Sequence, residues 1–159
     1  MTISTSDINS LQGKFSLLYN NKLINELAKM YHDGAHVVIP HSPKIIGRAN
    51  ITESFINYLE SGADKFITES TNIMIFDDYA IETGKYTVFG CGNTTIDLGR
   101  YQLLWKHING EIVIENEIAT STSIKEKITH PADIPDRFME TFSERAYRSL
   151  LENSYLNIT

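Results

Sequence analysis

The feature that most constrains this chain is the dipeptide Asn109-Gly110, which separates two segments rich in β-branched and aromatic residues. Both residues tolerate the positive φ angles that a type I′ turn needs, so the pair predicts a tight hairpin. Its strands are then Thr95–His107 and Glu111–Ile118. Alternation along the second strand places three isoleucines on one face of the sheet: Ile112, Ile114 and Ile118.

Two further strands precede this hairpin. Tyr79–Phe89 is followed by the turn residues Gly90–Asn93, and Phe66–Phe76 is followed by Asp77-Asp78. The four strands together predict an antiparallel meander with one apolar face, which other elements must cover.

Apolar residues at helical spacing occur in three earlier segments. The first helix is expected over about Ser6–Tyr19. A second helix, capped by Asn21, is expected to carry Tyr31 on its inner side and to end at Gly34. The third follows Gly47-Arg48 and ends at Gly62, with its stripe at Ile51, Phe55, Tyr58 and Leu59.

Short strands are expected at Ala35–Ile39 and Lys44–Ile46. Helices before and between the strands of an antiparallel sheet indicate the α+β class. Helices laid across a curved sheet leave a conical space, which is a natural place for an internal ligand pocket.

The end of the chain has a different character. Residues 121–135 are polar, contain two prolines and resemble a linker, whereas residues 136–153 predict an additional helix. Its apolar stripe is Phe138, Met139, Phe142, Ala146 and Leu150. We therefore divide the chain into a domain at 1–120 and an extension at 121–159, whose helix docks on a partner subunit, over the pocket mouth or on its own domain.

Composition excludes several classes of function. The net charge is -6 and no basic run occurs, which argues against nucleic acid as a partner. Cys91 is the sole cysteine, and no His, Cys, Asp or Glu cluster has the spacing of metal ligands. The N-terminus does not resemble a signal peptide and no apolar run could cross a bilayer, so we expect a cytoplasmic protein without cofactor, metal or membrane partner.

Four motifs occur in an order that resembles a known superfamily. They are Tyr31–Ala35, Ile46-Gly47-Arg48 with Ile51 and Phe55, Asp78–Tyr86, and Asp97–Lys106 with Asn109-Gly110. In this order they resemble the nuclear transport factor 2-like superfamily, in particular its SnoaL-like and ketosteroid-isomerase-like branch. The resemblance covers about residues 8 to 120 and implies a cystatin-like cone of sheet and helices and a homodimer formed through the outer sheet face.

The superfamily hosts isomerases, dehydratases, cyclases, hydrolases and dimerisation modules, so the fold alone does not assign an activity. Steroid isomerases of this type carry a base Asp directly before the proline of the first strand, where this chain has Ile39. Their Tyr oxyanion donor in the first helix falls near Phe15. The resemblance therefore implies that steroid isomerisation by that mechanism is absent.

The expected pocket is apolar and aromatic. In the superfamily the side of the Trp-bearing strand commonly faces the pocket, which places Tyr101 and Trp105 there; core packing is the alternative. An Asp97–Arg100 pair would suggest an epoxide hydrolase, but the two lie on opposite faces unless Gly99 forms a bulge. The full expected lining is Phe15, Ile39, Phe55, Tyr58, Tyr86, Tyr101, Leu103 and Trp105.

Two residues are the candidate proton-transfer groups. His41 follows the first strand, where a histidine can act as a general acid or base; the alternative is an exposed turn histidine beside Ser42-Pro43. Glu117, like Glu82, is a carboxylate within a strand, and the superfamily often has a polar pocket residue at the position of Glu117. The alternative is that Glu117 faces solvent, because alternation puts Ile114 and Ile118 on the other face.

The sequence thus predicts a SnoaL-like domain that binds a small apolar molecule and lacks the steroid isomerase base. One alternative is an enzyme that performs acid–base chemistry on a polyketide-like or steroid-like carbonyl compound. A second is a non-catalytic dimerisation or assembly module. A buried His or Glu at the pocket floor would favour the enzyme.

Overall fold

The computed structural model describes residues 2–122. The elements are α1 (Thr5–Asn20), α2 (Ile24–Ala28), β1 (Tyr31–Val38), β2 (Ile45–Ile46), α3 (Arg48–Glu60), β3 (Lys65–Phe76), β4 (Tyr79–Phe89), the 3₁₀ turn η1 (Cys91–Asn93), β5 (Thr95–Ile108) and β6 (Glu111–Ser121). The helix expected at 136–153 lies outside the described residues, as does the expected linker beyond Thr122.

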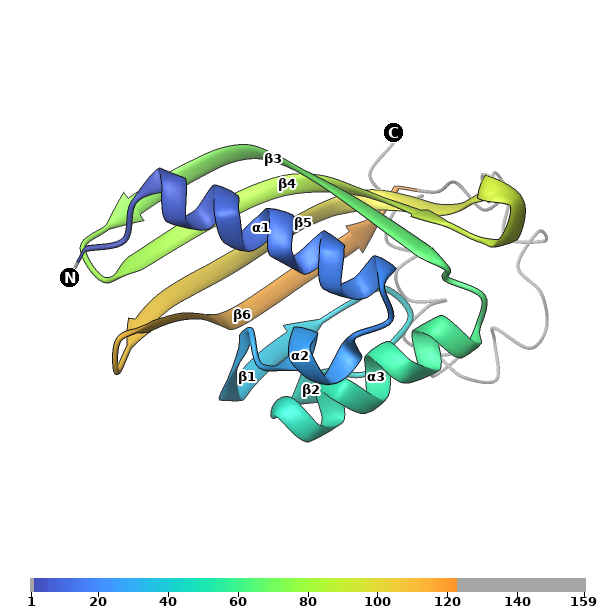
Figure 1. Ribbon diagram of the computed structural model, residues 1–159, viewed down its shortest axis with the longest axis horizontal. Coiled ribbons are helices and arrows are strands. Elements are labelled where there is room, and N and C mark those ends of the chain that lie inside the picture. Colours follow the sequence, from blue (N-terminus) through green and yellow to red (C-terminus); the bar gives the residue numbers. More distant parts are fainter. Residues whose placement is uncertain (1, 123–159) are drawn as a thin grey trace, which may run out of the picture. The chain divides into compact units, whose positions relative to one another are not determined.

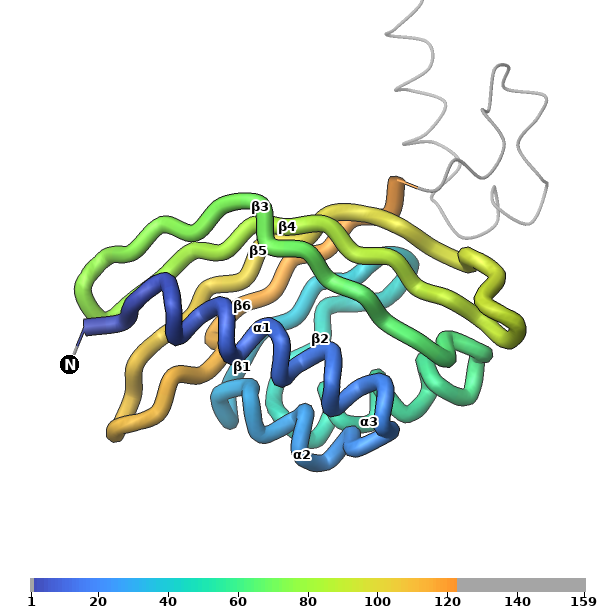
Figure 2. The backbone as a smooth tube through the Cα atoms, turned by 45° about the horizontal axis from the view of Figure 1, so that its top comes forward, coloured from blue at the N-terminus to red at the C-terminus, as the bar shows by residue number. Residues whose placement is uncertain are grey.

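The strands form one sheet of the α+β class, in the order β2-β1-β6-β5-β4-β3 (Figure 1). The meander from β3 to β6 is antiparallel, as predicted. β1 runs parallel to β6, a pairing that the sequence analysis did not assign. The sheet is curved, and α1 and α3 lie on its concave side, which we call the inner face (Figure 2).

Local signals explain where the helices begin. The Ser4 hydroxyl accepts from the Asp7 backbone N–H, and the Asp7 carboxylate accepts from the Ser4 N–H, which forms a capping box at the start of α1. α3 begins after Gly47, whose φ of 87° favours glycine. Both helices confirm the predicted spans.

The hairpin turn between β5 and β6 is also as predicted. Asn109 and Gly110 have φ angles of 52° and 87°, the two positive values that a type I′ turn requires. This turn sets the register of the β5–β6 pair and therefore decides which side chains reach the inner face.

The second helix is shorter than predicted. α2 ends at Ala28, and Tyr31 begins β1 instead of ending a helix. Two contacts with distant residues hold the chain extended there: the Ile114 N–H donates to the Met30 carbonyl at 2.7 Å, and Arg48 donates to the Tyr31 carbonyl. Helical periodicity around Tyr31 is overridden by these long-range bonds.

Candidate functional site

The inner face of β5 alternates without interruption through the expected site. Gly99, Tyr101, Leu103 and Trp105 are buried, whereas the residues between them are exposed or half-buried. The pairing of β4 with β5 is continuous from Val88–Asp97 to Tyr79–Lys106, so Gly99 forms no bulge; the irregularity falls at Ile96. Asp97 therefore faces inward and Arg100 outward, and an epoxide-hydrolase-like pair does not form.

Glu82 of β4 is a fully buried carboxylate on this face. Its Oε1 accepts from the Tyr101 hydroxyl at 2.8 Å, and its Oε2 accepts from the Trp105 indole N–H at 2.8 Å. Burial raises the pKa of Glu82, and the hydrogen bonds from Tyr101 and Trp105 oppose that rise. Since both oxygens are engaged and inaccessible, Glu82 serves to position the two aromatic side chains.

Glu117 reaches the inner face because β6 contains a β-bulge. Trp105 pairs with Ile114 and Leu104 pairs with Asn116, which leaves Glu115 as an extra residue. Beyond it the alternation is inverted, so Ile118 is 47% exposed. The expectation that Ile118 shares the face of Ile114 was wrong, and with it the solvent-facing alternative for Glu117.

The carboxylate of Glu117 is held by a tyrosine from β1. The Tyr31 hydroxyl donates to Glu117 Oε2 at 2.5 Å, while Glu117 Oε1 has no hydrogen bond among the described residues. Burial raises the pKa of Glu117 and outweighs the lowering effect of this hydrogen bond. The residue as a whole is half-buried, so Glu117 combines a raised pKa with partial exposure.

Arg48 fixes Tyr31 from the start of α3. Its Nε and Nη2 donate to the Tyr31 carbonyl at 3.1 and 2.8 Å, and its Nη1 lies 2.8 Å from Asp33 Oδ1. Arg48 belongs to the Gly47-Arg48 motif, so the motif has a definite role here: it anchors the strand that carries the tyrosine partner of Glu117.

The two inward carboxylates lie on either side of one residue. Leu103 pairs with Glu82 on β4 and with Glu117 on β6. With two strand spacings between them, their backbones are roughly 10 Å apart. Burial is the main cause of the raised pKa of Tyr101, and the charges of Glu82 and Glu117 both add to it. The protonation of Tyr101 is therefore linked to both carboxylates.

A third acid lies farther along β5. Asp97 accepts from the Tyr86 hydroxyl at 3.0 Å and from the Ser121 hydroxyl at 2.6 Å. Burial, with the charge of Asp97 second, raises the pKa of Tyr58 on α3 to about 12. The inner face thus carries carboxylates and tyrosines along much of its length.

Aromatic rings fill the space between α1, α3 and the sheet. Phe15 packs edge-on against Phe55 and Phe66 with centroids 6.1 and 5.9 Å apart, and Phe66 stacks on Tyr86 at 5.5 Å. This cluster gives the inner side a flat, apolar character beside the polar row.

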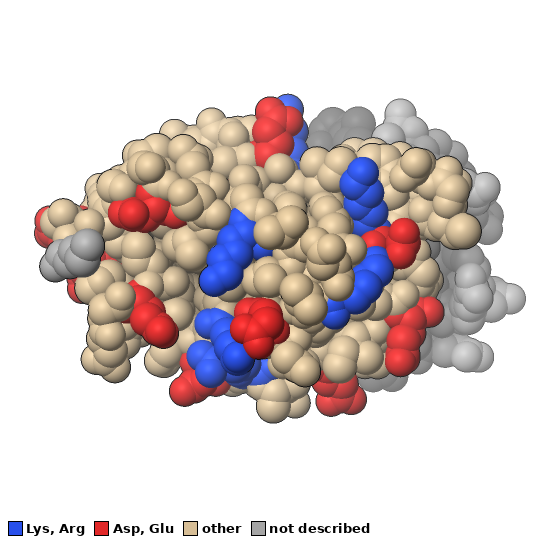
Figure 3. Space-filling view, viewed as in Figure 1, with Lys and Arg blue, Asp and Glu red and all other residues tan. Residues whose placement is uncertain are grey.

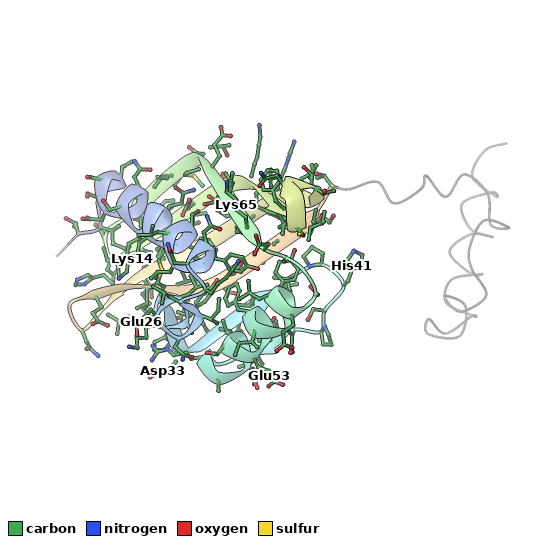
Figure 4. The ribbon with its side chains drawn as sticks, turned by 45° about the vertical axis from the view of Figure 1, so that its right-hand side comes forward. Lys14, Glu26, Asp33, His41, Glu53 and Lys65 are labelled. Carbon is green, nitrogen blue, oxygen red and sulfur yellow. The ribbon has the colours of Figure 1, made fainter. Side chains whose placement is uncertain are left out.

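All the residues expected to line a pocket pack into the same core, five of them buried and three half-buried: Phe15, Tyr86, Tyr101, Leu103 and Trp105, then Ile39, Phe55 and Tyr58. Their role in ligand binding stays a prediction. His41 is exposed in the loop before β2, with a φ of 60°, and points away from the sheet (Figure 4). The structure thus brings Glu117 to the inner face. It leaves His41 outside, in agreement with the alternative that this residue is an exposed turn histidine.

Sequence reasoning missed the partner of Glu117. Tyr31 was placed on a helix, where its hydroxyl had no predicted role. The signal for the inversion at Glu115 was present: Val113 and Ile114 are consecutive apolar residues, and Glu115 and Asn116 are consecutive polar ones. Such a break in alternation is typical of a β-bulge.

Charged groups outside the core form no large patch of one sign in the face that Figure 3 shows, where basic and acidic side chains are interspersed. Within residues 2–122, no three His, Cys, Asp or Glu side chains come together as a metal site. None of the helices in that range is both long and apolar enough to cross a membrane.

Comparison with known proteins gives the fold. No family model and no curated protein matches the sequence. Among solved structures, an NTF2-like protein with a cystatin-like fold from Novosphingobium aromaticivorans matches with a TM-score of 0.67 and 11% identity, over 74% of this chain and 81% of that one.

Two other similar structures have names that refer to enzymes. A ketosteroid isomerase-like protein from Erwinia carotovora atroseptica has a TM-score of 0.59 and 14% identity, over 69% of this chain and 88% of that one. A type 2 hexachlorocyclohexane dehydrochlorinase (LinA) has a TM-score of 0.59 and 16% identity, over 72% of this chain and 82% of that one. The sheet order, the helices on its concave side and these likenesses together show that the chain has the nuclear transport factor 2-like, cystatin-like fold.

Proposed function

We propose that the chain is an enzyme that transfers protons on a small, largely apolar carbonyl compound, with Glu117 as the general acid–base. The observation that carries this proposal is the environment of Glu117: an inward carboxylate whose pKa burial raises, held through one oxygen by Tyr31 and part-buried rather than sealed. A carboxyl group with a raised pKa exchanges protons more effectively near neutral pH.

The proposed step uses the free oxygen of Glu117. Oε1 takes a proton from the carbon next to the substrate carbonyl, the C–H electron pair forms an enolate, and the same carboxyl group returns the proton to the same or another carbon. Tyr31 keeps Oε2 in place and stabilises the charged carboxylate by donating to it. The half-buried rings of Phe55 and Phe66, at the edge of the aromatic cluster, provide apolar surface for the substrate body.

Likeness of fold supports an enzyme only indirectly. A ketosteroid isomerase-like protein and a hexachlorocyclohexane dehydrochlorinase are among the similar structures. The residue before Pro40 is Ile39 and the α1 residue facing Phe55 is Phe15, so neither the base nor the donor of the steroid isomerases occurs at its expected position. The proposed chemistry therefore rests on Glu117 rather than on those positions.

Hydrogen–deuterium exchange into 2-tetralone, a flat apolar ketone, tests the proposal. The full chain should accelerate exchange of the protons next to the carbonyl above the buffer rate, and Glu117→Gln should slow this by about 100-fold or more. Glu111→Gln is the matched control, because it removes the same charge from an exposed position of β6. Exchange no faster than in buffer, or a fully active Glu117→Gln protein, would contradict the proposal.

A non-catalytic binding domain is the second candidate, favoured by the extent of the aromatic cluster. It predicts that 2-tetralone binds equally well to the wild-type and Glu117→Gln proteins and that neither accelerates exchange. Fluorescence of Trp105, which lies on the inner face, reports binding in both proteins.

We also propose a homodimer formed through the outer face of the sheet. Several large apolar side chains are exposed there: Ile46, Ile67, Met74, Leu98 and Ile118. Covering them with a second copy would remove this area from water. Sedimentation at micromolar concentration should give a dimer, and an 18.0 kDa species alone would contradict this.

A further inference from the structure

The neighbouring strands β4 and β5 carry the same short motif. Residues 82–88 and 97–103 both read acid, any residue, Gly, base, Tyr, any residue, aliphatic. The copies pair antiparallel, with Gly84 opposite Tyr101, Lys85 opposite Arg100 and Tyr86 opposite Gly99. They are therefore related by a local two-fold axis that passes between Lys85 and Arg100.

The symmetry appears in the contacts on the inner face. Each tyrosine pairs with the glycine of the other strand and donates its hydroxyl to the acid of that strand: Tyr101 to Glu82, and Tyr86 to Asp97. Since side chains alternate along a strand, the basic residue between each Gly and Tyr must point to the outer face. The inner arrangement thus forces two cations into direct cross-strand contact on the other side.

No ion pair neutralises these two cations within the described residues. Lys85 and Arg100 are both exposed, and neither forms an ion pair within residues 2–122. Glu69 pairs with Lys85 in register on β3, yet no ion pair joins them. Like charges directly opposite each other destabilise a sheet, and an anion bound between the two cations would relieve this repulsion.

The cations line a groove on the outer face. It is open, with a volume of about 640 Å³, and its other lining residues are Thr71, Thr83, Gln102 and Thr120 together with Gly84, Tyr101 and Ile118. No carboxylate lines it, although the chain as a whole has a net charge of -6. α1, α2 and α3 all lie on the other side of the sheet (Figure 2).

We propose that this groove binds an oxyanion, meaning the phosphate, sulfate or carboxylate group of a small molecule. The Arg100 guanidinium can hold two oxygens of such a group at once, Lys85 adds a point charge, and the surrounding hydroxyl groups donate hydrogen bonds. The site is separate from Glu117 and does not depend on the proposed acid–base chemistry. It lies on the face through which we propose the homodimer, and Ile118 belongs to both surfaces, so anion binding requires that the dimer leave the groove open.

Titration of the full chain with inorganic phosphate, sulfate and acetate tests the site. Ionic strength is held constant with sodium chloride, and backbone amide NMR shifts are followed. At least one anion should give saturable shifts centred on residues 83–86 and 99–102. The anion that binds tightest identifies the natural group as phosphate, sulfate or carboxylate.

Variants separate a defined site from general charge attraction. Arg100→Gln should weaken the apparent affinity at least 10-fold and Lys85→Gln several-fold, whereas Lys14→Gln on the exposed side of α1 should leave it unchanged (Figure 4). At low salt, each groove variant should also raise the melting temperature, because it relieves repulsion between the two cations. Shifts that never saturate, or equal weakening by Lys14→Gln, would overturn the proposal.

Discussion

Tyr101 lies directly over Gly84, its pairing partner on β4, and this overlap is what lets its hydroxyl reach Glu82 two residues away. A Cβ atom at Gly84 would fall well inside van der Waals contact with the Tyr101 ring. The glycine is thus required by a side chain from another strand rather than by its own backbone, since its φ is not among the positive ones.

Gly84→Ala should therefore be strongly destabilising. The Tyr101 ring must move and its hydrogen bond to buried Glu82 is lost, so we expect a fall of about 3 kcal/mol in the free energy of unfolding. Gly13→Ala is the control: a Cβ there meets nothing within 4 Å, and alanine favours the helix, so it should stabilise. Urea denaturation of both variants measures the difference, and equal stabilities would refute the account.

Glu82→Ala should cost about 3 kcal/mol, because it leaves the Trp105 indole N–H buried without an acceptor and creates a cavity. Glu82→Gln should cost much less. Its oxygen can accept from Trp105 while its amide donates to the Tyr101 hydroxyl, which can reverse its role from donor to acceptor. Comparable losses in both variants would show that the negative charge itself is needed.

The stability of the protein should fall as pH rises from about 4.5 towards neutrality through the raised pKa values of Glu82 and Glu117. The sign follows because the folded state binds more protons than the unfolded state in this window. Glu82→Gln should flatten the fall. Asp7 acts below this window, since its pKa is lowered from 3.8 and its contribution disappears on acidification. Unfolding free energies measured between pH 4 and 8 at constant salt test this, and a steeper slope in the variant would contradict it.

Arg48→Lys should lower the free energy of unfolding by about 1 to 2 kcal/mol, because an ammonium cannot reproduce two bonds to the Tyr31 carbonyl and one contact with Asp33. Asp33→Asn removes only the exposed ion pair and should change stability little, since Asp33 is 81% exposed. If the two variants lose equal stability, the ion pair rather than the carbonyl anchor is what matters.

The protein should not isomerise a β,γ-unsaturated ketosteroid through the positions that the steroid isomerases use. Ile39 cannot accept a proton and Phe15 has no hydroxyl, so the two groups that those enzymes use are missing at those positions. Any turnover, measured by the absorbance of the conjugated product, should therefore depend on Glu117. Turnover that survives in the Glu117→Gln protein would contradict this.

Local signals predicted much of the fold and long-range contacts explain the misses. β4 has the predicted bounds, Tyr79 to Phe89, because turn residues flank it on both sides. Tyr31 was assigned to a helix because its neighbours have helical spacing, whereas Arg48 and Ile114 decide its conformation. The homodimer, the ligand and the C-terminal helix stay predictions.

The side chains of the site could be placed from the sequence to different degrees. Simple alternation along β5 puts Tyr101 and Trp105 on the same face, and the resemblance implied that this face points inward; both residues are buried in the structure. Placement of Glu117 depends on the pairing of β6 with β5, where one extra residue is accommodated. Alternation within β6 does not reveal where one of its residues lacks a partner on β5. The sequence therefore left both alternatives for Glu117, the inner face and the solvent side.

The bulge at Glu115 allows β6 to lose one residue without changing its inner face. Deleting Glu115 in frame would remove the bulge and leave Ile114 and Glu117 two positions apart, so both would still face inward. If the bulge were lost with every residue kept, Asn116 and Ile118 would instead replace Glu117 and Ala119 inside, and the inner face would lose this acid without any substitution. A relative that is one residue shorter in this strand can therefore keep the same inner face, and its alignment needs a gap at the bulge.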